Sequence, residues 1–248
     1  MTKLDTDLTS SWKNYDKINS KYEKRLTLEY KMVFDALQKE VVSNLGSEVK
    51  SELFSLSYYL NYVFNITKKT KTNLINETLS LFFKDVDINY NSSSFNEELN
   101  KVLKDSLKLD EKSLKTIRDE LKAQVRSIKD LNPDLNKKEL LNKLVSEINM
   151  KFDLNYKSSR IKMITQTVAT YTSEDSKKKA GKKIGIGRQW ISQRDSKVRP
   201  NHRKLDGVKE DKDGKFNLGG RLTSQPAGEN LPARELVNCR CFTRGFKI

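Results

Sequence analysis

The stretch INSKYEKRLTLEYKMVFDALQKEVVSNL, residues 18–45, repeats an apolar side chain every three or four positions. An α-helix brings positions at this spacing onto one face, so the stretch predicts a long amphipathic helix. Ser10 and Ser11 are candidate N-caps and Gly46 is a candidate C-cap, which predicts a helix of about 35 residues. We expect a partner to cover the apolar stripe. The stripe consists of Ile18, Tyr22, Leu26, Tyr30, Val33, Leu37, Val41 and Leu45.

Further stripes of the same period predict helices along the chain as far as residue 179. The polar run at 87–94 predicts a loop, and Asn132-Pro133 ends a helix because proline restrains the residue before it. Asn136 is the expected N-cap of the helix that follows. The other helices are expected at about 47–65, 70–83, 95–107, 110–131 and 158–179.

The composition changes after Lys179. This segment holds nine of the ten glycines and three of the four prolines, which predicts short strands, turns and short helices. The expected fold class is therefore mainly α, with a helical N-terminal region at 1–133 followed by a small basic α+β module at 134–248.

The positive charge is concentrated at the C-terminal end. Residues 1–150 carry 25 Lys and Arg against 23 Asp and Glu, whereas residues 151–248 carry 23 against 10. A field of this kind attracts nucleic acid, an acidic protein surface or anionic lipid, although it equally suits a merely solvated surface. The candidate DNA or partner surface consists of Lys177, Lys178, Lys179, Lys182, Lys183, Arg188, Arg194 and Arg203.

Neither a transmembrane helix nor a secretory leader is expected. The chain has no run of 18 apolar residues, and its first five residues include no apolar stretch. Cys239 and Cys241 are two residues apart, which is poor geometry for a mutual disulfide. We therefore expect synthesis in the cytoplasm with reduced thiols and no membrane partner.

Two ordered motifs lie about 35 residues apart in the C-terminal module. The first reads Arg199-x-x-His202-x-x-Leu205-Asp206-Gly207, and the second is Asn238-Cys239-Arg240-Cys241. The other residues of the pattern are Trp190, Ser192, Asp195, Phe216 and Pro226.

This order resembles the phage Mu F-like minor head proteins, the phage head-morphogenesis family, over about residues 136–242. The family commonly shows an Arg-Thr-Glu run in the preceding helix, where this chain has Thr165-Gln166-Thr167. The resemblance implies a minor capsid protein of a tailed phage, located in the virion at the head interior or portal vertex. Its implied partners are the portal protein, other capsid proteins and double-stranded DNA. Its implied role is head assembly and DNA packaging or ejection, without enzymatic activity.

His202, Cys239 and Cys241 are candidate metal ligands, since one imidazole and two thiolates suit zinc, with Asp206 or solvent as the fourth ligand. The alternative is that no cofactor binds, that His202 stabilises a turn and that the cysteines are small buried side chains. Arg199 and Asp206 flank His202 at helical spacing, so we expect an Arg199–Asp206 pair that organises the turn. Trp190 is expected to pack in the core of the module.

Two other functions stay open. One is a nucleic-acid-binding module of a mobile element without sequence preference, and the other is a zinc-dependent enzyme. The sequence has no G-x-S-x-G, H-E-x-x-H or Walker motif, and its single histidine argues against an HNH nuclease. The glycine-rich run at 181–187 lacks the G-K-[ST] end of a phosphate loop.

Overall fold

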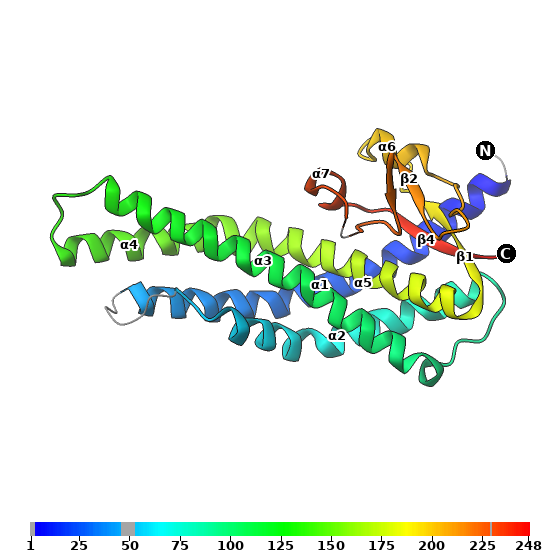
Figure 1. Cartoon of the computed structure of the whole chain (residues 1–248), viewed down its shortest axis with the longest axis horizontal. Helices are drawn as coiled ribbons and strands as arrows, with labels where there is room; N and C mark the ends of the chain where they lie inside the picture. The colour runs from blue at the N-terminus through cyan, green and yellow to red at the C-terminus, as the bar shows by residue number, and fades with distance from the viewer. Residues whose placement is uncertain (1–2, 46–52, 229) are drawn as a thin grey trace. The chain divides into compact units, whose positions relative to one another are not determined.

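A computed structural model describes residues 3–45, 53–228 and 230–248 (Figure 1). It confirms a mainly helical chain with a small α+β part near the C-terminus. In chain order the elements are α1 (Lys3–Leu45), α2 (Leu56–Lys84), η1 (Ser92–Phe95), α3 (Asn96–Asp130), α4 (Lys137–Lys151), η2 (Phe152–Arg160), α5 (Ile161–Ile184), β1 (Ile186–Ile191), α6 (Pro200–Lys204), β2 (Phe216–Leu218), β3 (Arg221–Thr223), α7 (Ala233–Leu236) and β4 (Phe242–Lys247).

The chain divides into two compact units, and the long helices contribute to both. The first unit comprises 1–25, 68–106 and 166–248, and the second comprises 26–67 and 107–165. The expected domain boundary between residues 133 and 134 stays a prediction.

The apolar stripe of α1 is buried within the chain, contrary to the expectation that a partner covers it. Six of its eight members are buried: Tyr22, Leu26, Tyr30, Val33, Leu37 and Val41. In the second unit the Tyr30 hydroxyl donates to the buried Asp110 carboxylate. The Phe34 ring packs edge-on against Tyr156 at 6.3 Å between centroids. Neighbouring helices of the same chain therefore supply the apolar surface that the stripe needs.

Three helix boundaries differ from the expected ones. α1 begins at Lys3, so Ser10 and Ser11 lie inside it, whereas Gly46 and the expected start of the next helix at residue 47 lie outside the described residues. The helices expected at 47–65 and 70–83 are continuous within α2, because no glycine or proline separates them. The Thr67 hydroxyl donates to the Val63 carbonyl at 2.8 Å, which satisfies this polar side chain inside a helix. The helices expected at 95–107 and 110–131 are likewise continuous. Residue 95 is the last residue of η1, and α3 covers the rest as far as Asp130.

The helix that follows Pro133 begins as expected. The Asn136 side chain accepts from the backbone N–H groups of Lys138 and Glu139, and Glu139 accepts from the Asn136 N–H, which completes a capping box. At its C-terminal end, α4 continues into the π-helix η2 and then α5. The expected break before residue 158 is absent because helical backbone bonds carry on through η2.

The α+β part of the first unit consists of two small antiparallel pairs. β1 pairs with β4, with Ile186 opposite Lys247 at one end and Ile191 opposite Phe242 at the other. β2 pairs with β3. Gly187 lies opposite Phe246, whose ring is 2.4 Å from where a Cβ would stand, so a larger residue there would displace this ring.

The N-terminal part of α1 packs on this α+β part within the first unit. The rings of Trp12 and Tyr15 lie 6.3 and 6.2 Å from the Phe242 ring. The Trp12 indole N–H donates to the Arg240 carbonyl at 2.9 Å. Residues far apart in the sequence thus form one hydrophobic cluster, which also includes Leu8 and Ile191.

We expect Asn136→Ala to lower the free energy of unfolding by about 1 kcal/mol, because it removes the side-chain acceptor of the capping box. Urea denaturation followed by circular dichroism measures the change. Lys138→Ala, at an exposed position in the same turn, is the control. Equal effects of the two substitutions would contradict the capping role.

Candidate functional site

The sequence motifs of the C-terminal module converge on one buried cluster. Trp190 lies near the end of β1, His202 lies in α6, and Cys239 and Cys241 lie in the segment that leads into β4. α6 starts where Pro200 occupies its first turn, a position at which proline needs no N–H partner. The hydrophobic core around the cluster contains Trp190, Leu205, Phe216, Leu218, Ala227, Leu231, Leu236, Cys239 and Cys241.

Both cysteine sulfurs approach the same nitrogen of His202. Nδ1 lies 3.6 Å from the Cys239 Sγ and 3.5 Å from the Cys241 Sγ. The other ring nitrogen, Nε2, lies 2.9 Å from a carboxylate oxygen of Glu235 in α7. All three side chains of this His–Cys–Cys cluster are buried, at 1% exposure for His202 and 3% for each cysteine. Both thiols are free.

The cluster stabilises opposite charges on its members. Burial opposes protonation of His202, but hydrogen bonds from the imidazolium to Cys239 and Glu235 raise its pKa above the ordinary value. The pKa of Cys239 is lowered by its hydrogen bonds with Cys241 and His202. The pKa of Cys241 is raised, because it shares its proton with Cys239 and is buried. The cluster therefore favours one thiolate beside an imidazolium.

Trp190 packs in the core, as expected. It is fully buried, and its ring meets those of His202 and Phe216 edge-on, at 5.8 and 5.2 Å between centroids. Its backbone carbonyl accepts from the Gly207 N–H at 2.8 Å, where Gly207 has a φ of +81°. Leu205 and Pro226 are also buried.

The expected Arg199–Asp206 pair is wrong, because α6 ends at Lys204 and the helical spacing does not extend to Asp206. Arg199 instead donates to the Val237 carbonyl. Asp206 accepts from the Ser192 N–H at 2.8 Å and from Arg194 Nε at 2.6 Å. Its carboxylate is thus used in the turn, and it is not part of the His–Cys–Cys cluster.

The second motif also contributes ion pairs and backbone geometry. Arg240 pairs with Asp195 at 3.1 Å, which joins the Asn238–Cys241 segment to the loop before α6. Asn238 has a positive φ of 55°, a conformation that asparagine tolerates better than most residues. These contacts place Cys239 and Cys241 facing α6.

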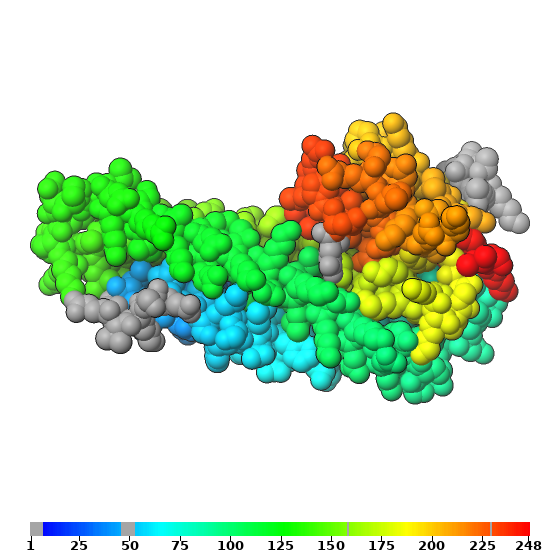
Figure 2. Space-filling model, in the orientation of Figure 1, coloured from blue at the N-terminus to red at the C-terminus, as the bar shows by residue number. Residues whose placement is uncertain are grey.

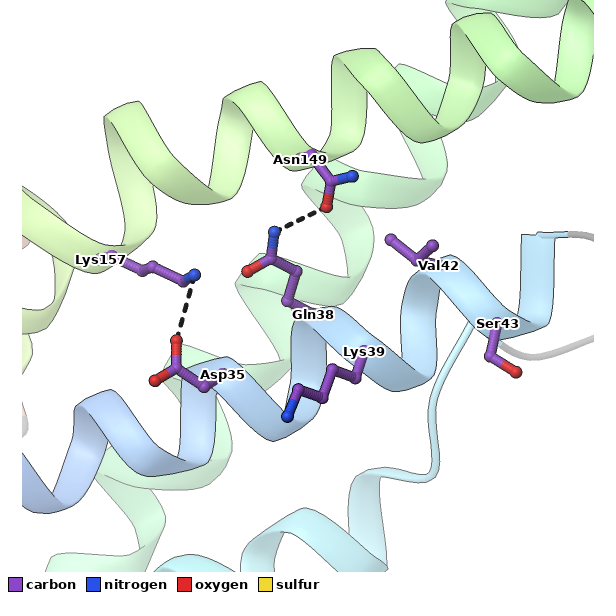
Figure 3. A pocket seen from close by; sticks show the side chains of 7 residues that line it. All are labelled: Asp35, Gln38, Lys39, Val42, Ser43, Asn149 and Lys157. Atoms are coloured by element: carbon purple, nitrogen blue, oxygen red, sulfur yellow. Dashed lines mark hydrogen bonds and ion pairs between the residues drawn. The ribbon is translucent and has the colours of Figure 1, made fainter.

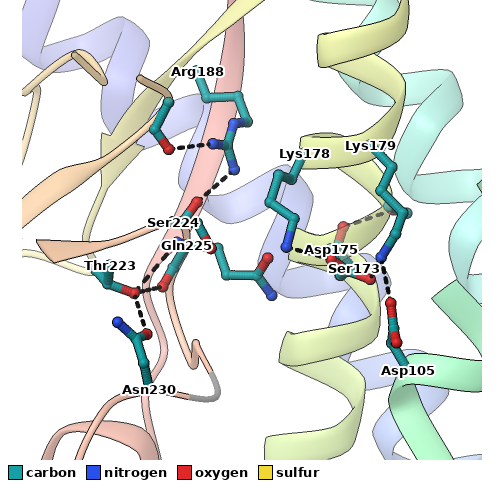
Figure 4. A network of polar contacts seen from close by, with 12 residues as sticks. Asp105, Ser173, Asp175, Lys178, Lys179, Arg188, Thr223, Ser224, Gln225 and Asn230 are labelled. Atoms are coloured by element: carbon teal, nitrogen blue, oxygen red, sulfur yellow. Dashed lines mark hydrogen bonds and ion pairs between the residues drawn. The ribbon is translucent and has the colours of Figure 1, made fainter. Parts of the chain in front are cut away.

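Two members of the expected basic surface are buried, so that expectation is wrong for them. Lys177 is buried and pairs with Glu174, and Arg188 is buried and pairs with Glu210 at 2.5 Å. A buried cation requires a counter-charge, and both have one. Arg188 also donates to the Ser224 carbonyl at 2.8 Å (Figure 4).

Lys178 and Lys179 are half-buried and turn toward carboxylates. Lys178 pairs with Asp175 at 2.7 Å, and Lys179 contacts both Asp175 and Asp105 (Figure 4). The remaining members of the expected surface are exposed: Lys182, Lys183, Arg194 and Arg203.

Glu174 was not predicted as a functional or structural residue, although it anchors β4. Its carboxylate accepts from the backbone N–H and the hydroxyl of Thr243, at 3.0 and 2.7 Å. Lys177 donates to the Thr243 carbonyl at 2.6 Å and lies 4.0 Å from the centre of the Tyr15 ring. Burial lowers the pKa of Lys177 and raises that of Glu174, while the opposite charge of each partner counteracts both shifts.

A surface pocket in the second unit lies between α1 and the α4–η2 segment (Figure 3). Gln38 donates to Asn149 at 2.6 Å, and Lys157 pairs with Asp35 at 3.1 Å. These groups satisfy one another across the pocket, which supports a structural role for them.

No family model, curated protein or solved structure matches this chain. Within the described residues, no helix combines the length and apolar character needed to cross a bilayer.

We expect Lys177→Met to lower the free energy of unfolding by about 3–5 kcal/mol, because it leaves the Glu174 carboxylate buried without its counter-charge. Lys182→Met, at an exposed position of the same helix, should change stability by less than about 0.5 kcal/mol. Urea denaturation of both variants measures the difference. A cost for Lys177→Met as small as that of the control would contradict the buried pair.

Proposed function

We propose that this chain is a minor head protein of a tailed phage, a low-copy virion component that docks at the portal. Its role is in head assembly and in DNA packaging or ejection. The observation that carries the proposal is the convergence of the family-like motifs. Trp190, His202 and the Cys239–Cys241 segment come from three separate stretches of the chain and meet in one buried cluster. Motif residues that meet in one core are expected where a motif determines the fold of a module, and this supports the proposal.

The burial of the cluster supports an assembly role over catalysis. His202, Cys239 and Cys241 each have 3% exposure or less. A catalytic group must touch its substrate, and these side chains face the inside of the module. The motif therefore stabilises the module rather than presenting reactive groups at its surface.

The long helices support an assembly role as well. α1 and α3 have 43 and 35 residues, much longer than the roughly 11–12 residues of an average helix. Most of the apolar stripe of α1 is buried within the chain, and its remaining surface is largely polar and charged apart from the exposed Leu28 and Met32. Docking on the portal would use such polar surface and would not require the helices to unpack.

Mass spectrometry of DNA-filled heads tests this function directly. Heads purified after induction of the phage or prophage that encodes the chain should contain it at a few copies per portal. Deleting its gene should reduce the yield of infectious, DNA-filled particles. Its absence from heads, together with unchanged particle yield after deletion, would overturn the proposal.

Contact with DNA is the second part of the proposal. Exposed basic residues lie in and just before α6: Lys197, Arg203 and Lys204 lie within eight positions of one another. In the space-filling view the residues from α6 onward form a contiguous part of the surface of the first unit (Figure 2). Such a group can neutralise phosphates without reading the base sequence.

We expect Lys197→Glu/Lys204→Glu to weaken binding to a random-sequence duplex and to reduce the slope of log K against log salt by up to about 2. Fluorescence anisotropy between low and moderate salt measures both quantities. Arg126→Glu/Lys129→Glu in α3 makes the same change in net charge at exposed positions and is the matched control. No binding by the unaltered chain at low salt, or equal effects of both variants, would contradict a DNA surface at α6.

A further inference from the structure

The His–Cys–Cys cluster has the spacing of a metal site. A tetrahedral zinc ion with bonds of about 2.3 Å to sulfur and about 2.0–2.1 Å to nitrogen holds each sulfur about 3.5 Å from the nitrogen. The observed separations between Nδ1 of His202 and the two sulfurs are 3.6 and 3.5 Å. All three potential ligand atoms lie within 4.8 Å of one another. The two nitrogen–sulfur separations thus match those of a tetrahedral zinc site.

Two sulfurs, rather than one, lie close to Nδ1 of His202. A neutral imidazole nitrogen has one lone pair in the ring plane, which accepts one S–H, whereas two sulfurs lie at the same distance from Nδ1. Without a metal, an imidazolium pairs with the Cys239 thiolate, and the Cys241 thiol donates to that thiolate. A metal ion at the centre uses both sulfurs and the nitrogen at once.

Glu235 supplies the contact that orients a ligating histidine. Its carboxylate lies 2.9 Å from Nε2 of His202, the ring nitrogen that points away from the sulfurs. A carboxylate there accepts a hydrogen bond from Nε2–H. The other nitrogen, Nδ1, then carries the lone pair, which faces the cysteines. Histidine ligands of zinc almost always have such an acceptor behind them.

A buried N–H donor next to the cluster has no conventional acceptor, and a negatively charged sulfur would provide one. The indole Nε1–H of Trp190 is buried without a conventional acceptor among the described residues, and it lies beside the Cys241 sulfur. A sulfur that carries negative charge accepts an N–H better than a neutral thiol does. Metal binding keeps both sulfurs in that charged form.

We propose that His202, Cys239 and Cys241 bind a structural zinc ion, with Glu235 as the positioning residue that orients His202. The two thiolates and the imidazole supply three ligands, and a water molecule completes the tetrahedron. Thiolate sulfur and imidazole nitrogen favour zinc over magnesium or calcium, which prefer oxygen. Because the ligands are buried, the ion stabilises the module and does not serve an external substrate.

The proposed ion would close a long loop of the chain. His202 and Cys241 are separated by 39 positions, so binding joins α6 to the segment that leads into β4. Between α6 and Cys241, the residues that the structure describes form two three-residue strands and one four-residue helix. A metal cross-link compensates for such limited secondary structure, because it removes freedom from the unfolded chain.

Metal analysis of the full chain, purified without chelators, tests the site. Inductively coupled plasma mass spectrometry should find about one equivalent of zinc per chain. Replacement by Co²⁺ should produce the near-ultraviolet absorption of thiolate-to-cobalt charge transfer and the visible bands of a tetrahedral site. Less than about a tenth of an equivalent of zinc, with no cobalt bands after reconstitution, would overturn the proposal. Copper in place of zinc, or an intact mass that shows a Cys239–Cys241 disulfide, would overturn it as well.

Variants place the metal at this cluster. Cys239→Ser/Cys241→Ser should abolish the cobalt charge-transfer absorption, and retained absorption would mean that the ion binds elsewhere. Glu235→Gln keeps all three ligands, so it should retain the cobalt spectrum while weakening zinc affinity about 10–100-fold in competition with a chromogenic chelator. Asp213→Asn, which removes a carboxylate at an exposed position of the same α+β part, is the matched control and should leave affinity unchanged. Equal affinities of these two variants would refute the positioning role of Glu235.

Possible unfolding of the cysteine variant does not obscure the result. Chelator treatment of the unaltered chain should lower its melting temperature, and added zinc should restore it, which needs no substitution. Far-ultraviolet circular dichroism of Glu235→Gln confirms that its lower affinity is measured on a folded chain. An unaltered melting temperature after complete removal of the metal would overturn the structural role.

Discussion

The buried ion pair between Glu174 and Lys177 holds the C-terminal strand to the long helix α5. Both side chains are fully buried, and both bond to Thr243 in β4. A buried charge is tolerated only when its partner is present and well placed, so this pair fixes the position of β4. β1 then pairs with β4 along six residues, and the cluster of His202 and the two cysteines forms at the end of that pair.

The same constraint explains why much of the positive charge is unavailable for a partner. Lys177 and Arg188 neutralise buried acids, while Lys178 and Lys179 compensate Asp175 at the edge of the core. The excess of basic residues in the last two-fifths of the chain therefore has two roles. Part of it stabilises the fold, and the exposed part around α6 is what can meet DNA or an acidic protein surface.

The sequence predicted the elements whose signals are local. The stripe of α1, the N-cap at Asn136 and the glycine-rich change after Lys179 depend on residues a few positions apart, and the structure confirms them. The predicted breaks within α2 and α3 were wrong. A local interruption of the apolar pattern does not end a helix when no glycine or proline is present. The grouping of His202 with Cys239 and Cys241 was expected from residue type and is confirmed as a spatial cluster.

A mainly helical chain, a basic C-terminal segment and the three side chains of the candidate metal site could thus be predicted from residue type and local pattern. Three features required the tertiary structure. They are the burial of particular charges, the absence of an Arg199–Asp206 pair and the contact between Glu235 and Nε2 of His202. The physical reason is distance along the chain. Helix periodicity and caps act over one or two turns, whereas burial and charge pairing depend on segments brought together from tens or hundreds of residues apart.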